Sequence, residues 1–241
     1  MTTADDVRSI TVVVPTFRRP AGLARVLGGL AATADPDIPW TVIVVDNSGG
    51  CDRSVVPASL ADRTSLIHER EPGAAAARNR GIREATADVV AFLDDDVVPS
   101  PTWLRAILAG FVAPKVDGVG GRVVLDQAVV RPRWFIDDIF GPLLADFDRG
   151  QEAFDLPVGS FLLSANLAVR RDSLMKAGGF DTRLGPHPGR PGANDDVDLC
   201  RRLLSSGHRL RYLPDAVVTH ELPAARLRRR YVIRRHYEQG R

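Results

Sequence analysis

Cysteine is scarce in this sequence, which contains only Cys51 and Cys200 among 241 residues. Two thiols cannot build a disulfide framework or a four-ligand zinc site, so we expect a protein of a reducing compartment with structural thiols. Long apolar runs are also missing, because no stretch approaches the roughly 20 residues that span a bilayer. Residues 1–8 are polar and acidic, which predicts no signal peptide and a cytoplasmic protein.

Excess charge of one sign is absent as well. The formal net charge is only +2, and lysine occurs only at Lys115 and Lys176, so arginine carries nearly all the positive charge. A chain so close to neutrality lacks the broad basic surface that matches a phosphate backbone, and nucleic acid is not expected as a partner. Hydrophobic residues make up 44% of the chain, which favours a packed core over disorder.

Apolar strands alternate with amphipathic helices through the first half. Strands are predicted at 10–14, 40–45 and 89–93, and helices at 23–30, at 74–87 and after an N-cap at Ser100 with Pro101 at the first helical position. This alternation is typical of the α/β class. It predicts a Rossmann-like, mostly parallel central sheet with helices on both faces.

The second half is less regular. Further strands are predicted at 119–125, 161–169, 210–213 and 216–219, and helices at 171–177 and after an N-cap at Asn194, with Val197, Cys200, Leu203 and Leu204 on its apolar face. Residues 126–158 show no period, and the Pro- and Gly-rich stretch 187–192 is expected to be a loop. No repeat or linker is visible, so residues 1–241 are expected to form a single domain.

Polar residues stand where three predicted strands end: Pro15-Thr16, Asp46 and the triplet Asp94–Asp96. Ligands of open α/β sheets bind beyond the carboxyl ends of the strands, so these residues should face one crevice. Three successive carboxylates repel one another, and a divalent cation would relieve that repulsion, since Mg²⁺ is held by one or two carboxylates together with phosphates and water. A solvated acidic turn is the alternative.

Two nucleotide-binding patterns are absent. No G-x-G-x-x-G follows the first strand and no G-x-x-x-x-G-K-[ST] occurs, which disfavours a dinucleotide dehydrogenase and a P-loop enzyme. A second acidic cluster, Asp195, Asp196 and Asp198, lies at a helix start, where it either stabilises the helix dipole or supplies a general base. His220 follows a strand and is either structural or a metal ligand.

Six segments, taken in order, resemble one known family. They are VVVPTFRR at 12–19, the strand ending at Asp46, Gly73 with ARNRGI at 77–82, FLDDD at 92–96, AGGFD at 177–181 and NDDVDL at 194–199. Across about residues 10–220 the chain resembles the family 2 inverting glycosyltransferases with the nucleotide-sugar-binding A-type fold (GT-A). The pair Asp195-Asp196 departs from that family's usual Glu-Asp pair.

The resemblance implies a role for each matching residue. Residues implied to bind the nucleotide are Pro15, Thr16, Arg18, Asp46, Arg78, Asp94 and Asp95, with Asp94 near the ribose. Asp96 and His220 are implied to bind Mn²⁺ or Mg²⁺. Asp196 is implied to be the catalytic base, and Asp195 is the second candidate for that role.

The implied reaction moves a sugar with inversion from a nucleotide diphosphate sugar, with UDP first and dTDP and GDP still open, to a hydroxyl of a glycan, a lipid-linked or a small-molecule acceptor. Residues 1–115 would form the nucleotide-binding half and residues 116–241 the acceptor-binding half, expected to lack part of its carboxyl end because family members often continue further. A sugar nucleotidyltransferase and a non-catalytic nucleotide-sugar-binding module are the competing interpretations.

The tail from Arg226 to Arg241 is rich in arginine. It predicts either a solvated basic helix or a peripheral contact with the anionic inner face of a membrane, where a lipid-linked acceptor would lie.

Overall fold

The computed structural model describes residues 7–112, 115–187 and 192–239, and within them nine strands form one sheet. The strands are β1 (Ile10–Thr16), β2 (Trp40–Asp46), β3 (Thr64–His68), β4 (Val89–Phe92), β5 (Val97–Pro99), β6 (Gly118–Leu125), β7 (Phe154–Asp155), β8 (Leu167–Arg170) and β9 (Leu210–His220). Their spatial order is β3-β2-β1-β4-β8-β6-β9-β5, and β7 pairs with β9. The pairings make β1, β2, β3, β4, β6 and β9 point one way, and β5, β7 and β8 the other. The sheet is therefore mostly parallel, as predicted.

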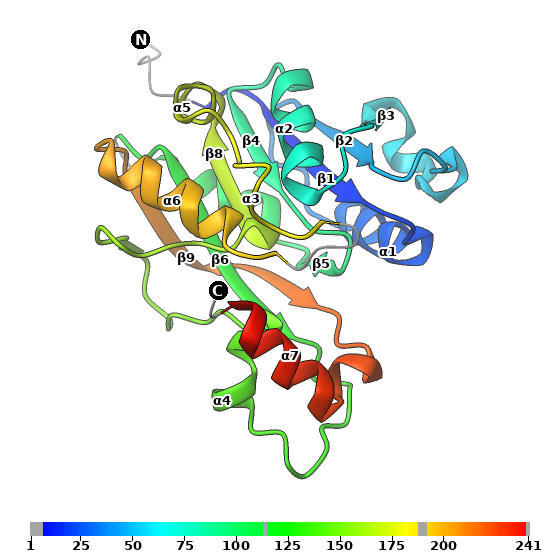
Figure 1. Ribbon diagram of the computed structural model, residues 1–241. Helices are drawn as coiled ribbons and strands as arrows, with labels where there is room; N and C mark the ends of the chain where they lie inside the picture. Colours follow the sequence, from blue (N-terminus) through cyan, green and yellow to red (C-terminus); the bar gives the residue numbers. More distant parts are fainter. Residues whose placement is uncertain (1–6, 113–114, 188–191, 240–241) are drawn as a thin grey trace.

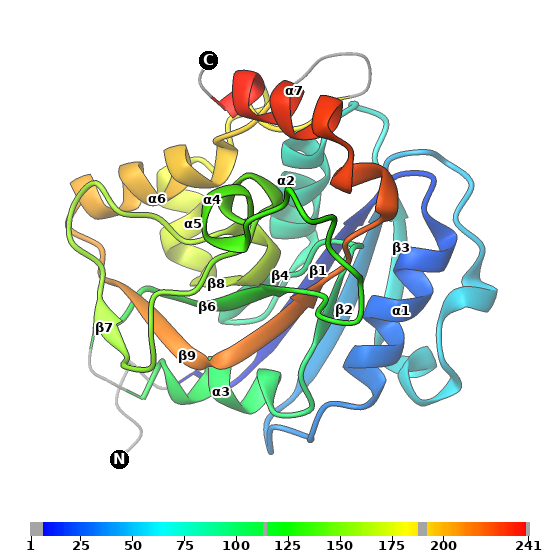
Figure 2. The same cartoon turned by 90° about the horizontal axis from the view of Figure 1, so that it is seen from below.

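Helices cover both faces of this sheet. They are α1 (Pro20–Ala31), α2 (Ala74–Glu84), α3 (Trp103–Ala109), α4 (Asp137–Phe140), α5 (Arg171–Ala177), α6 (Asp195–Ser205) and α7 (Arg229–Gln239). Figure 1 shows their arrangement around the curled sheet, and Figure 2 shows α1 and α3 on one side with α2, α5 and α6 on the other. The predicted α/β class and its layers are confirmed.

The first strand and helix follow directly from sequence. Residues 10–16 are all buried, because β1 lies inside the sheet with helices on both sides. In α1, Pro20 occupies the first turn, where a missing N–H costs nothing, and Leu23, Val26, Leu27 and Leu30 are at most 1% exposed.

The strand predicted at 161–169 is wrong over most of its length, because β8 begins only at Leu167 and a 3₁₀ turn covers Ser164–Asn166. Polar groups in this segment have other partners. The fully buried Asn166 side chain donates to the carbonyls of Arg122 and Ala216 and accepts from the Trp103 indole. A buried amide side chain needs hydrogen-bond partners for its N–H and C=O groups. The partners that Asn166 finds hold this segment in a turn and not in a strand.

The predicted N-caps at Ser100 and Asn194 need correction. Helix α3 begins at Trp103 with Thr102 as its N-cap residue, and Ser100 instead forms a turn, accepting from the Trp103 N–H and donating its own N–H to Val217. Asn194 is the N-cap residue of α6, but its φ of 71° is left-handed and its side chain makes no capping hydrogen bond. Helix 74–87 ends three residues early, at Glu84.

The two extended segments around Pro214 form a single strand. Strand β9 continues through the proline because its pairing with β6 slips there, from Gly121 opposite Leu213 to Arg122 opposite Val217. This irregularity accommodates a residue without an N–H. Within α6, Leu199 is buried whereas Val197 is only half-buried, so its apolar face is rotated slightly from the prediction.

A separate apolar cluster organises the last part of the chain. Helices α4 and α7 pack around Leu125, Phe135, Leu144, Leu222, Leu227 and Val232. We call residues 129–144 and 222–237 the C-terminal lobe, which projects from one end of the sheet (Figure 1). No helix in the described ranges is both long and apolar enough to cross a bilayer.

Candidate functional site

The carboxyl ends of three parallel strands meet at one sheet edge. In the pairing of β1 with β2, Thr16 lies opposite Asp46, and on its other side β1 pairs with β4. The segments that follow border a cleft of about 410 Å³. Its walls are Pro15, Thr16, Phe17, Arg19, Asn47, Gly73, Ala74, Ala77, Arg78, Asp94, Asp95, Asp96, Pro186, His187 and Arg226. Most of the residues predicted to bind nucleotide therefore lie together.

Asp95 is buried at the floor of this cleft. Its carboxylate accepts a 2.7 Å hydrogen bond from the Thr16 hydroxyl and lies 3.2 Å from the Arg19 guanidinium. Burial raises the pKa of Asp95 to about 6, although Thr16 and Arg19 both act in the opposite direction. The Thr16 side chain thus holds an acid in place.

Asp96, which lines the cleft, lies against the buried His220, with 3.3 Å between Asp96 Oδ2 and His220 Nε2. Strand pairing brings them together, since His220 lies opposite Val97, the residue after Asp96. Two arginines neutralise Asp96: Arg226 donates to Oδ2 at 2.8 Å and Arg19 at 3.0 Å. Burial alone would raise the pKa of Asp96, but the adjacent guanidinium groups of Arg226 and Arg19 lower it well below its usual range.

The His220 ring has an assigned tautomer. Its Nδ1 lies 2.8 Å from the Leu144 carbonyl oxygen, which can only accept, so Nδ1 carries the hydrogen. Nε2 accepts from the Arg226 guanidinium, 2.9 Å away. A hydrogen bond at Nδ1 is the arrangement that orients a metal-binding imidazole through its other nitrogen.

This donor set fits a hard divalent cation. Within the described residues no group of three or more His, Cys, Asp or Glu side chains could hold a metal ion. Mg²⁺ and Mn²⁺ do not need such a cage, because one or two protein ligands combined with phosphate and water suffice. Asp96 Oδ2 and His220 Nε2 would supply one carboxylate, a ligand that suits Mg²⁺ and Mn²⁺, and one imidazole.

Arg78 joins the cleft to a neighbouring cavity. It comes from α2, its side chain is 4% exposed, and its guanidinium donates to Asp94 at 2.6 Å and to Asp195 at 2.7 Å. The ring of Phe180, from the predicted AGGFD segment, lies 5.4 Å from the same guanidinium. The two acids raise the pKa of Arg78 against the effect of its burial. One buried cation therefore ties the first acidic cluster to the second.

The second cavity has a volume of about 690 Å³ and is bordered by the start of α6. Asp196 lines it and accepts backbone hydrogen bonds from Ser164 at 3.2 Å and Val197 at 2.9 Å. Burial and the adjacent Asp195 raise the pKa of Asp196 to about 6, against the pull of Arg78. Residues 188–191 of the predicted loop lie outside the described residues.

Asp46 lies at the expected strand end but does not line the cleft. Its carboxylate accepts four hydrogen bonds from the following loop, namely from the N–H and hydroxyl of Ser48 and the N–H groups of Gly50 and Cys51. Burial would raise the pKa of Asp46, but these bonds lower it. In this structure the side chain organises the loop that carries Asn47 into the cleft wall.

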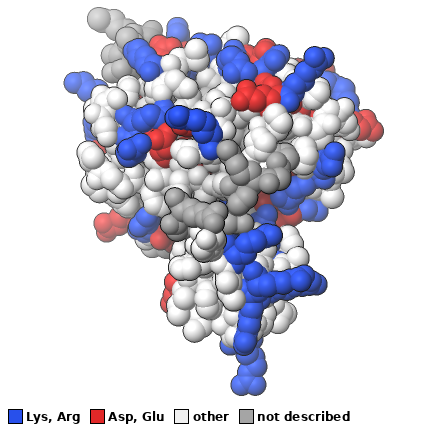
Figure 3. All heavy atoms as spheres, in the orientation of Figure 1, with Lys and Arg blue, Asp and Glu red and all other residues white. Residues whose placement is uncertain are grey.

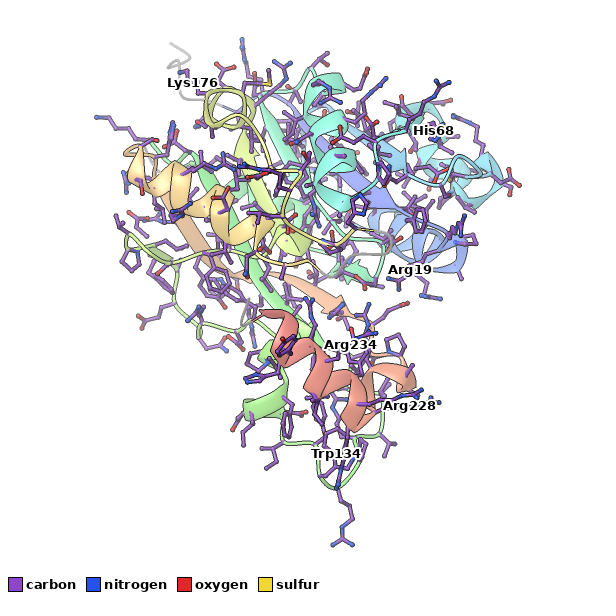
Figure 4. The ribbon with its side chains drawn as sticks, in the orientation of Figure 1. Arg19, His68, Trp134, Lys176, Arg228 and Arg234 are labelled. Carbon is purple, nitrogen blue, oxygen red and sulfur yellow. The ribbon has the colours of Figure 1, made fainter. Side chains whose placement is uncertain are left out.

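Arg18 also departs from its predicted place. Its φ of 54° turns the chain, and its guanidinium lies over the Phe17 ring at 5.1 Å, outside the cleft. The neighbouring Arg19, labelled in Figure 4, reaches the acids instead. Sequence reasoning missed Arg19 and Arg226. The signal for Arg19 was its place directly after the first strand, whereas Arg226 was hidden among the other tail arginines.

The two cysteines show no sign of catalysis. Cys200 is completely buried, and burial raises its thiol pKa to about 12. Cys51 is half-buried and its thiol pKa is also raised, by burial and by Asp46 and Asp52. Raised values keep both thiols protonated and unreactive.

Known proteins match both the sequence and the fold. Residues 11–178 match the family model described as Glycosyl transferase family 2. The pre-mycofactocin glycosyltransferase of Mycobacterium tuberculosis is 36% identical over 223 residues, which cover 89% of this chain and 43% of that protein. The glucosyl-dolichyl phosphate glucuronosyltransferase of Haloferax volcanii is 26% identical over 219 residues, 88% of this chain and 67% of that protein. The chain thus spans less than half of the mycobacterial relative.

Two solved structures with bound ligands share the fold. The mannosyltransferase PcManGT from Pyrobaculum calidifontis, in complex with GDP-Man and Mn²⁺, superposes with a TM-score of 0.64 at 24% identity over 98% of this chain and 64% of that one. GalNAc-T7 with UDP, GalNAc and Mn²⁺ has a TM-score of 0.65 at 12% identity, covering 90% of this chain and 44% of that one.

Proposed function

Because the chain belongs to glycosyl transferase family 2, a family of glycosyltransferases, we propose that it transfers a sugar from a nucleotide diphosphate sugar to an acceptor hydroxyl with inversion, using a divalent cation. The observation that carries this proposal is the ionic chain Asp94–Arg78–Asp195, which connects the two cavities. Donor and acceptor would meet where that chain crosses from one cavity to the other.

The first cavity suits the nucleotide diphosphate. Apart from Pro186, His187 and Arg226, its residues lie within 1–115, the proposed nucleotide-binding half, and it offers arginines for the phosphates. A divalent cation held by Asp96 and His220 would neutralise the charge that develops on the departing diphosphate. A UDP-sugar is the first candidate donor, and GDP- and dTDP-sugars are the alternatives to test.

The second cavity suits the acceptor. Apart from Arg78 and Asp94, its residues lie between 142 and 235, in the proposed acceptor-binding half. We assign Asp196 as the general base that takes the proton of the attacking hydroxyl, because a carboxylate with a pKa near 6 is a better proton acceptor than an ordinary one. Asp195 accepts a hydrogen bond from Arg78, and its role in this proposal is to hold the Arg78 guanidinium in position.

The first experiment measures nucleotide release from UDP-, GDP- and dTDP-sugars, with water as the acceptor and with or without Mn²⁺. We expect metal-dependent release from one donor and its loss in Asp196→Asn. Thermal unfolding shows binding separately, because a ligand at 100 times its Kd stabilises by about 2.7 kcal/mol, roughly 5–10 °C for a chain of this size. Binding in the wild type with neither donor hydrolysis nor sugar transfer to an acceptor would favour a non-catalytic module.

Inversion has its own test. An α-linked donor should yield the β-anomer first, which proton NMR resolves before the free sugar equilibrates. A freshly released α-anomer would contradict a single displacement with Asp196 as base.

The acceptor side of the proposal includes an anionic membrane surface. Arg228, Arg229, Arg230 and Arg234 are exposed on α7 and the turn before it, and they form a basic area on the C-terminal lobe (Figure 3). Ile233 in their midst is 69% exposed. Basic charge around an exposed apolar side chain is typical of interfacial helices, and Arg235 of α7 also lines the acceptor cavity.

Vesicle flotation tests this surface. The wild type should float with vesicles containing anionic phosphatidylglycerol and not with neutral phosphatidylcholine, and Arg228→Gln/Arg229→Gln/Arg230→Gln should stay behind. A matched triple variant of exposed arginines outside the tail, Arg53→Gln/Arg70→Gln/Arg183→Gln, controls for net charge. Equal loss in both triple variants would exclude a localised membrane contact.

A further inference from the structure

Arg226 lies between the two side chains proposed to hold the metal. It belongs to the 3₁₀ turn Ala224–Leu227, which connects β9 to α7. One guanidinium nitrogen donates to Asp96 Oδ2 at 2.8 Å and the other lies 2.9 Å from His220 Nε2. Those two acceptor atoms are only 3.3 Å apart, so a single planar cation bridges both.

The guanidinium uses the same lone pairs that a metal would need. The Nδ1–H of His220 is committed to Leu144, which leaves Nε2 as its only coordinating atom, and Arg226 occupies that atom. Asp96 Oδ2 is likewise taken, by Arg226 and Arg19. A divalent cation cannot coordinate this pair while Arg226 keeps both contacts.

The charges around the pair are already balanced. Asp95, Asp96 and Glu221 face Arg19, Arg25 and Arg226 through direct ion pairs. Within these ion pairs three negative charges meet three positive charges, so this group has no net negative charge of its own. A metal entering alone would add two positive charges to this neutral group, which is unfavourable where most of these side chains are largely buried.

We infer that Arg226 is an internal substitute for the metal, which holds Asp96 and His220 in place and leaves them when diphosphate and divalent cation enter together. This inference rests on the proposed function, since both ligands come from it. The diphosphate supplies the missing negative charge. Arg226 also lines the donor cleft, so the guanidinium that leaves Asp96 has the diphosphate as its next anionic partner.

A thermodynamic consequence follows. Metal binds weakly to the free protein and much more tightly to the nucleotide-bound protein, and by linkage the metal strengthens nucleotide binding by the same factor. Removing Arg226 should remove part of this coupling, because the ligands are then available to metal alone.

The test is a Mn²⁺ titration followed by electron paramagnetic resonance, which detects free Mn²⁺, with and without UDP and GDP. Without nucleotide, Arg226→Ala should bind Mn²⁺ about tenfold more tightly than the wild type. Arg226→Lys should lie between them, because one ammonium cannot bridge both acceptors in the same planar way. Arg228→Ala is the matched control, since it removes the same charge two residues away at an exposed position.

The outcomes separate this inference from the proposed function. If nucleotide-dependent Mn²⁺ binding is lost in Asp96→Ala but Arg226→Ala binds Mn²⁺ no more tightly than Arg228→Ala, the metal site stands and the role of Arg226 is overturned. If no variant binds Mn²⁺ in an Asp96-dependent way, the metal site and the inference both fail. Melting curves of each variant establish that it is folded before titration.

Discussion

Replacing Arg78 with methionine should destabilise the protein strongly, because it leaves a buried carboxylate without its cation. The side chains of Arg78 and Asp195 are only 4% and 6% exposed, and their 2.7 Å contact lies away from solvent. Removing one partner of such a pair typically costs about 3–5 kcal/mol. For a chain of this length the melting temperature should fall by roughly 6–20 °C.

A matched control lies on the same helix. Arg80 is 37% exposed and pairs with Glu84 one turn later, a contact whose removal costs about 0.3–0.5 kcal/mol. Arg80→Met should therefore lower the melting temperature by no more than about 1–2 °C. Differential scanning calorimetry on both variants compares the loss of a buried guanidinium–carboxylate contact with the loss of a surface one.

A double variant tests the cause. Arg78→Met/Asp195→Asn removes the buried unpaired charge at position 195 and leaves only the more exposed Asp94 without its cation, so it should be more stable than Arg78→Met alone. If Arg78→Met melts within 2 °C of Arg80→Met, or if the double variant is less stable than Arg78→Met, then the buried ion pair does not hold the two cavities together.

Three further predictions concern the base, a strand end and the core. Asp196→Asn should lower kcat by about 10²–10⁴ with donor binding retained, and wild-type kcat/KM should fall about tenfold per pH unit below about 6, where the carboxylate becomes protonated. Asp46→Ala should cost about 2–4 kcal/mol in urea unfolding at neutral pH. The lowered pKa of Asp46 means that this difference shrinks as the pH falls below about 4. Gly81→Ala should cost about 1–3 kcal/mol, because its Cβ would lie 2.3 Å from Val13, whereas Gly28→Ala on α1, with open space, should be neutral or stabilising by up to about 1 kcal/mol.

Sequence patterns predicted the elements that repeat a simple period. The strand at 10–14 and the helix around Leu23–Leu30 were correct because each buries residues at regular spacing, and α5 was predicted with its bounds. The meeting of Thr16 with the acidic triplet followed from parallel strand ends. Short or irregular strands gave no such signal: β3, β5 and β7 were missed.

Side-chain choices within the site could not be read from spacing. Arg18 and Arg19 are adjacent and identical, and only the left-handed turn at Arg18 decides which one reaches the cleft. Asp46 lies at the expected strand end, yet its carboxylate oxygens accept hydrogen bonds from N–H groups of the following loop. Arg226 lies in a 3₁₀ turn after β9, and only the folded chain brings this turn next to Asp96. No local sequence pattern indicates that contact.

The register shift at Pro214 means that an inserted residue has different consequences at the shift and in the part of β9 that follows it. Beyond the slip, continuous register with β6 and β5 fixes which side of the sheet His220 faces. Alternate residues of a strand face opposite sides, so one residue inserted between Val217 and His220 would turn the imidazole away from Asp96. One residue inserted at 214–215 could be absorbed where the ladder is already interrupted. Natural length variation and engineered insertions are therefore expected at the bulge and not in the four residues that follow it.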